Sequence, residues 1–121
     1  DTADDYLGAR HLVPCTPYTL VDRRAIKQDL AETRQRGYAV QLEELAVGCC
    51  CVAAPVLDAD GATVASIGLS VPVERFRAER RELIRRCRET AARASRALGF
   101  TGRTAGPQEE LRARPSSRRA G

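Results

Sequence analysis

The chain has 121 residues, 43% of them hydrophobic and 30% charged, with a formal net charge of +4. This length suits one domain with a single modest core, and the absence of tryptophan predicts that aliphatic side chains fill it. No apolar run approaches the ~20 residues of a membrane-spanning helix, and no leader argues for secretion. The odd count of five cysteines favours reduced thiols in a cytoplasmic protein over a secreted disulfide framework.

The first 21 residues predict little regular structure. Residues 3–12, ADDYLGARHL, are a short helical candidate. Residues 13–21 follow with two prolines and two threonines, which indicate extended chain or loop. Leu7, Leu12 and Val13 have no clear partner within the chain. They are therefore candidates for a surface between subunits, and a pure assembly module is one alternative function.

The next segment predicts a helix over residues 23–36. Asp22 precedes it as an N-cap, because its carboxylate can accept the free amides of a first turn. Ile26 and Leu30 lie on one stripe, with charged side chains on the opposite side. Gly37 ends the helix, since glycine accepts the left-handed backbone that follows a last turn.

Three strands are expected next. The first is short, from Tyr38 to Val40, and the other two lie within GCCCVAAPVLDADGATVASIGLS, residues 48–70. The DADG stretch, residues 58–61, has the composition of a hairpin loop longer than two residues. If this loop has four residues, antiparallel pairing matches positions whose numbers sum to 119.

In that register the hairpin has two unlike faces, because side chains alternate along a strand. The apolar face is expected to bury against both helices and comprises Cys50, Val52, Ala54 and Val56, opposite Leu69, Ile67, Ala65 and Thr63. The other face is small or weakly polar and comprises Cys49, Cys51, Ala53 and Pro55, opposite Ser70, Gly68, Ser66 and Val64. Such a face suits the floor of a cavity that admits a small molecule.

The three consecutive cysteines do not predict a metal site. Strand geometry turns Cys50 away from Cys49 and Cys51, whereas structural zinc needs four converging ligands and the chain has one histidine. Catalysis by Cys51 with the paired carboxylates Glu43 and Glu44 is an alternative, but such pairs are mostly solvated or bonded to backbone amides. We therefore predict no cofactor, no metal and no enzymatic activity.

After Pro72 the apolar residues recur at intervals of three and four, which predicts a helix over residues 74–98 with Gly99 as its cap. Nine arginines between positions 75 and 96 alternate with glutamates. This pattern favours a solvated face over a phosphate-binding surface, although a basic fragment that contacts nucleic acid stays open as an alternative. Residues 101–121 predict a disordered basic tail after a domain of residues 1–100.

Several stretches together resemble the IclR family of bacterial transcription regulators. They are the helix that ends in RGYA, the hairpin EELAVGCCCVAAPVLDADG, and the serine and proline before the last helix. The resemblance covers residues 5–100 and lies in the C-terminal part of the effector-binding domain. It implies an α+β, GAF-like antiparallel sheet with helices on one face, present here as a partial domain, and a small-molecule pocket on the other face.

The resemblance also implies site residues and partners. The family's pocket positions fall on Gln41, Cys51, Gly68 and Ser70, and the effector is implied to be a small organic acid or aromatic catabolite. The family often has an acid at position 41 and a serine at position 68, so their loss favours a bulkier or less polar effector. A homo-oligomer, dimer or tetramer, is expected. Operator DNA is expected to bind through a winged helix-turn-helix segment that this sequence lacks, so we expect a fragment of a longer regulator.

Overall fold

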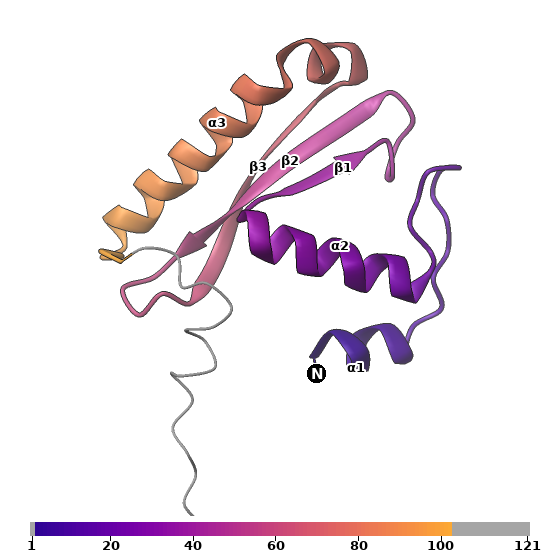
Figure 1. Cartoon of the computed structure of the whole chain (residues 1–121), viewed down its shortest axis with the longest axis horizontal. Coiled ribbons are helices and arrows are strands. Elements are labelled where there is room, and N and C mark those ends of the chain that lie inside the picture. Colours follow the sequence, from indigo (N-terminus) through magenta and orange to yellow (C-terminus); the bar gives the residue numbers. More distant parts are fainter. Residues whose placement is uncertain (1, 103–121) are drawn as a thin grey trace, which may run out of the picture.

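The computed structural model describes residues 2–102 and contains three helices and three strands. In chain order these are α1 (Thr2–Gly8), α2 (Arg23–Arg36), β1 (Ala39–Leu42), β2 (Cys49–Leu57), β3 (Thr63–Pro72) and α3 (Val73–Ala97). The strands form one antiparallel sheet in the order β1-β2-β3. Figure 1 shows α3 along one side of the strands and α2, with α1 beneath it, along the other. The α+β class expected from the sequence is confirmed.

The predicted tail lies mostly outside the described residues, and Leu7 is no longer a candidate for the surface between subunits. The tail predicted at residues 101–121 lies, from residue 103 onward, outside the described residues. Leu7 was expected to lack a partner within the chain, but it is buried. Its backbone carbonyl also accepts a hydrogen bond from the Arg23 Nε atom at 2.9 Å. No helix in the described part is long and apolar enough to cross a bilayer.

The ends of α2 lie where the sequence predicts them. The Asp22 carboxylate accepts a hydrogen bond from the backbone N–H of Ala25 at 2.8 Å, which satisfies one of the free amides of the first turn. Gly37 adopts a φ of +81° and donates its N–H to the Thr33 carbonyl, so the left-handed cap is formed. Both signals are local, which is why the bounds of 23–36 are confirmed.

In the described residues, the two clusters of buried side chains lie between the sheet and α3. One buried cluster joins Val52, Ala54 and Val56 to Cys87 and Ala91, and a second joins Cys50 and Val71 to Phe76 and Leu83. Cys50 and Cys87 act there as small apolar side chains, and desolvation raises the pKa of the Cys87 thiol.

The prediction that the helix over residues 23–36 also backs the apolar face is wrong. No side chain of α2 is buried, and Leu30 is 47% exposed. The physical reason is space: the 25 residues of α3 already cover the apolar face of the sheet.

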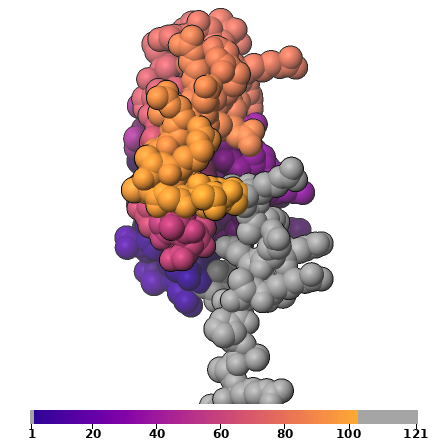
Figure 2. Space-filling model, turned by 90° about the vertical axis from the view of Figure 1, so that its left-hand side faces the viewer, coloured from indigo at the N-terminus to yellow at the C-terminus, as the bar shows by residue number. Residues whose placement is uncertain are grey.

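α3 is one helix bent at Glu79, whose backbone leaves the helical region at φ −121° and ψ 17°. Phe76 before the bend and Leu83 after it pack into the same cluster. The helix ends at Ala97. Gly99 follows the cap residue Leu98 with φ +94°, and the Phe100 N–H donates to the Ser95 carbonyl. This end of α3 lies against the tip of the β2–β3 hairpin, as Figure 2 shows from the side.

The register of the hairpin differs by two residues from the predicted one. Val52 lies opposite Leu69, and Val56 lies opposite Ala65, so partners sum to 121 along most of the hairpin. One residue of the shift comes from the turn, which has three residues instead of the predicted four. The Asp58 N–H donates to the Ala62 carbonyl at 2.9 Å and closes the loop, in which Gly61 has φ +80°. The other comes from a bulge between Val56 and Leu57. Two shifts of one residue restore the alternation, so the predicted faces are confirmed although the predicted partners are wrong.

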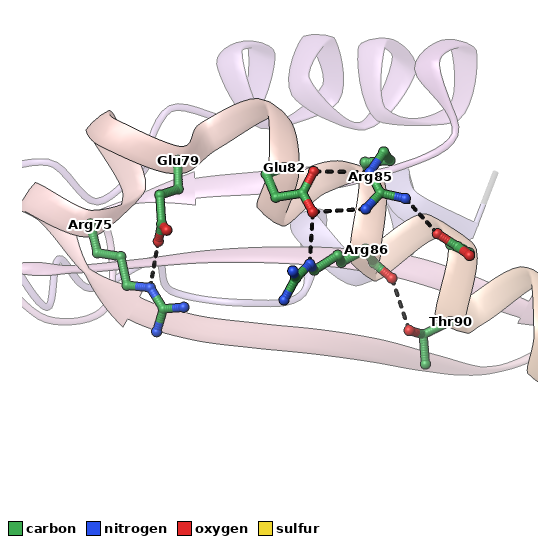
Figure 3. Close-up of polar contacts among 7 residues, drawn as sticks. Arg75, Glu79, Glu82, Arg85, Arg86 and Thr90 are labelled. Carbon is green, nitrogen blue, oxygen red and sulfur yellow. Dashed lines mark hydrogen bonds and ion pairs between the residues drawn. The ribbon is translucent and has the colours of Figure 1, made fainter.

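The outer side of α3 carries a chain of ion pairs (Figure 3). Glu82 accepts from Arg85 at 2.7 Å and from Arg86 at 2.8 Å, while Glu79 pairs with Arg75 at 2.6 Å. Hydrogen bonds from Arg85 and Arg86 lower the pKa of Glu82 to about 2.

Because that pKa lies below its unfolded value of 4.5, the stabilisation from Glu82 is present above pH 4.5. It is lost as the pH falls from there toward about 2. A carbon-detected NMR titration of the Glu82 carboxyl is expected to give its midpoint near pH 2. A double R85Q/R86Q variant is expected to move that midpoint up toward the ordinary range. An unchanged midpoint in the double variant would show that the arginines do not cause the shift.

Candidate functional site

The face of the sheet that points away from α3 is small, uncharged and open. From β1 to β3 its strand residues are Ala39 and Gln41; Cys49, Cys51, Ala53 and Pro55; and Ser66, Gly68, Ser70 and Pro72. The residues of β1 and β2 in this set are half-buried, whereas those of β3 are exposed. None of these side chains carries a charge, and none is large apart from the glutamine. The face therefore offers room and a few polar atoms rather than a second core.

Three of the four predicted site residues form one polar row across the three strands. Gln41, Cys51 and Ser70 are direct partners in the register of β1, β2 and β3. The Gln41 Nε2 atom donates to the Cys51 Sγ atom at 3.1 Å, and the Ser70 Oγ atom lies 3.0 Å from the same sulfur. The thiol thus links an amide on one side to a hydroxyl on the other. We call Gln41, Cys51 and Ser70 the polar row.

Gly68 lies on the same face, two residues before Ser70 and opposite Ala53. A Cβ atom built there would lie 3.4 Å from the Val52 carbonyl oxygen and 3.6 Å from the Ala53 Cβ atom, which is ordinary contact. The fold itself therefore tolerates an alanine at this position. What the glycine provides is a bare patch beside the polar row, together with the small Ala53 side chain.

The polar row is joined to the loop between β1 and β2. The Gln41 Oε1 atom accepts from the Glu44 N–H at 2.8 Å, so the amide group that reaches Cys51 also holds the loop. The loop has a strained start, because Glu43 has φ +56°, and the Glu43 carboxylate accepts from the Gly48 N–H at 2.9 Å. A movement of the Gln41 side chain would therefore break or move its hydrogen bond with the Glu44 N–H in the loop.

Two threonines that the sequence reasoning missed attach the loop to the segment before α2. The Thr16 hydroxyl donates to the Glu43 carbonyl at 2.7 Å, and the Thr19 hydroxyl donates to the Glu44 carbonyl. The Thr19 Oγ atom also accepts from the backbone N–H groups of Cys15 and Thr16. The threonine–proline pair in CTPYT is typical of a side-chain-bonded turn, but nothing local shows where its hydroxyls dock.

The structure gives no support for metal or thiolate chemistry on this face. Within residues 2–102 no group of three or more histidine, cysteine or acidic side chains could hold a metal ion. All five cysteines are unpaired. Desolvation, followed by the neighbouring Cys51 and Cys50 thiols, raises the pKa of Cys49, which keeps that thiol protonated. Desolvation also raises the pKa of Glu44, with Asp29 of α2 adding to the effect.

Comparison with known proteins gives one consistent family. The model described as bacterial transcriptional regulator IclR C-terminal matches residues 1–96. The HTH-type transcriptional repressor AllR of Escherichia coli K12 is 41% identical over 89 residues, which are 70% of this chain and 32% of AllR. The matched region thus spans about a third of the length of that relative.

Two solved structures show the same arrangement. The crystal structure of the Thermotoga maritima IclR has a TM-score of 0.73 and 36% identity, with 80% of this chain and 40% of that chain covered. A double mutant of the inducer-binding domain of PobR from Acinetobacter, in complex with 3-hydroxybenzoic acid, has a TM-score of 0.64 and 26% identity. That match covers 75% of this chain and 53% of the other.

Proposed function

Because the chain belongs to the IclR family of bacterial transcription regulators, as a portion of their C-terminal domain, we propose that it senses a small organic acid or aromatic catabolite. The effector is proposed to lie on the open face of the sheet, over the polar row and Gly68. The observation that carries this proposal is the convergence of an amide, a thiol and a hydroxyl on the uncharged face of the sheet that points away from α3.

The chemistry of the row sets what it can bind. Its Gln41 amide and Ser70 hydroxyl are neutral hydrogen-bond donors. Both groups now contact the Cys51 sulfur, which is a weak acceptor. A carboxylate or phenolic oxygen of the ligand is a stronger acceptor and can take the place of the sulfur. Ala53 and Gly68 leave room for the apolar body of the ligand beside them. The relative PobR was solved with 3-hydroxybenzoic acid, a molecule of this type. A neutral amide at position 41 favours an effector of lower polarity, as the sequence predicts.

The proposed mechanism is binding rather than turnover. In the catalytic alternative of Cys51 with Glu43 and Glu44, the Glu43 carboxylate accepts from the Gly48 N–H, and the Cys51 sulfur is hydrogen-bonded to the Gln41 amide and lies 3.0 Å from the Ser70 hydroxyl. An effector that bonds to Gln41 would compete with the Glu44 N–H for its side chain. The proposed output is a change in the β1–β2 loop and the Thr16–Thr19 segment bonded to it, which shifts the regulator between states by differential affinity.

The remaining partners are proposed at the level of the whole regulator. Effector binding would control how a DNA-binding part of that regulator engages its operator, in a homo-oligomer. Exposed apolar side chains at Leu45 and Val47, 70% and 66% exposed, support a subunit contact at the β1–β2 loop. The five unpaired thiols support a cytoplasmic regulator.

The test is an amide and side-chain NMR titration of the 121-residue chain. The probes are 3-hydroxybenzoate and a panel of aliphatic keto and hydroxy acids. We expect at least one probe to give saturable shifts at the Gln41 side-chain amide and at Cys51, Gly68 and Ser70. Arg86 and Thr90, on the outer side of α3, are expected to stay unchanged. Saturable shifts confined to α3, or none with any probe, would reject the proposal.

A further inference from the structure

The arginines of α3 divide into two sets. Glu79, Glu82 and Glu89 hold Arg75, Arg85 and Arg86 in ion pairs of 2.6–2.8 Å (Figure 3). The other arginines of the helix, at positions 77, 80, 81, 88, 93 and 96, take part in no ion pair within residues 2–102. Among this second set, Arg88 has a particular neighbour.

Arg88 and a second arginine from a distant part of the chain lie over the same tyrosine ring. The guanidinium carbon of Arg88 lies 5.4 Å from the centroid of the Tyr38 ring, and the guanidinium carbon of Arg36, at the end of α2, lies 5.0 Å from the same centroid. The Tyr38 ring packs against the core cluster of Val52 and Cys87, so it is a fixed platform. The Arg36 Nε atom donates to the Tyr38 carbonyl at 2.8 Å, which fixes that side chain as well.

Arg88 is also held close to the backbone. Its Nη2 atom lies 3.7 Å from the position that a Cβ atom would take on Gly37. The end of α2, the cap residue and the start of β1 are thus covered by two guanidinium groups. Neither group has a carboxylate partner in the described residues. On α3, Glu82 is bonded to Arg85 and Arg86, and Glu89 is bonded to Arg85.

One cation on a tyrosine ring is stabilising, but two cations beside one ring also repel each other. An anion that binds both would offset that repulsion. Arginine presents a planar fork of N–H donors that matches the oxygens of a phosphate group, and Arg36 keeps its terminal nitrogens free of any hydrogen bond in the described part. We propose that Arg36, Tyr38 and Arg88 form an oxyanion-binding site for a phosphate group, separate from the polar row on the opposite face of the sheet.

The phosphate group can come from a free phosphate ester or from the backbone of nucleic acid, and the experiment separates these sources. Inorganic phosphate and a random 16-base-pair DNA duplex are each titrated into the labelled 121-residue chain at low ionic strength. The Gly37 and Tyr38 amides and the arginine Nε–H signals are followed. We expect saturable shifts at these positions, and we expect R88Q to weaken the binding about tenfold, as loss of a charged hydrogen-bond partner does.

The matched control is R93Q, which removes one exposed arginine without an ion pair from the same helix. It is expected to leave the affinity within about twofold, because general charge attraction at the surface is weak. Circular dichroism checks that both variants stay folded. Saturation by inorganic phosphate assigns a small phosphate ligand, and saturation by the duplex alone assigns the nucleic-acid backbone. Equal weakening by R88Q and R93Q, or no saturable shift with either probe, would overturn the site.

Discussion

Replacement of Ser95 by alanine is expected to lower the free energy of unfolding by about 1–3 kcal/mol, the cost of leaving a buried polar group unpaired. Ser95 is 3% exposed, and its Oγ atom accepts from the Leu57 N–H at 2.9 Å. Leu57 lies at the bulge of the hairpin, where its N–H donates to the Ser95 hydroxyl. The same hydroxyl donates to the Ala91 carbonyl at 2.8 Å, so alanine removes both bonds.

Thr90 provides the matched control. Its hydroxyl also donates to the carbonyl four residues earlier, that of Arg86, at 2.8 Å, but Thr90 is exposed and accepts from no backbone amide in the described residues. Thr90→Ala is expected to change the free energy of unfolding by less than about 0.5 kcal/mol. Urea denaturation of the two variants measures the difference. Equal effects would show that Ser95 does not support the bulge.

Replacement of Ser70 by leucine is expected to weaken effector binding by about tenfold or more. The leucine would lie beside Cys51 and fill the space over the polar row, and steric overlap of this kind costs on the order of 1–3 kcal/mol. Ser70 is exposed, and leucine is tolerated in strands, so the fold is expected to stay intact. The affinity for whichever acid saturates the wild-type chain is measured by isothermal titration calorimetry.

Ser66→Leu is the control for that variant. Ser66 is exposed on the same face of β3, but it lies opposite Pro55, four residues or about 13 Å along the strand from Ser70. It makes no hydrogen bond to the polar row. Its leucine variant is expected to bind the acid as the wild type does. If Ser70→Leu also bound with unchanged affinity, the polar row would not be part of the binding surface.

The features that the sequence predicts well are local ones. Asp22 and Gly37 act within one turn of α2, and Gly99 acts within one turn of α3, so the ends of both helices can be predicted to within a residue. The two faces of the hairpin are predictable for a similar reason. Alternation depends only on position along each strand, and the two one-residue shifts add to an even number, which leaves the faces unchanged.

The features that the sequence does not predict depend on distant partners. The bulge at Leu57 is stabilised by Ser95, 38 residues later in the chain. The position of α2 depends on the fact that side chains of α3 already occupy the apolar face of the sheet. Segments far apart in sequence are also joined by the contacts of Thr16 and Thr19 with the β1–β2 loop and by the contact of Arg88 with the Tyr38 ring. No local pattern of residues marks any of these contacts.

The most direct test of effector binding on the open face is an isotope-filtered NOE experiment. The bound acid is unlabelled, and the chain carries ¹³C and ¹⁵N. We predict NOEs from the acid to the Gln41 side-chain amide protons and to the methyl group of Ala53, which lie on the side of the sheet away from α3. NOEs from a saturably bound acid to side chains of α3 instead, with none to Gln41 or Ala53, would contradict the account.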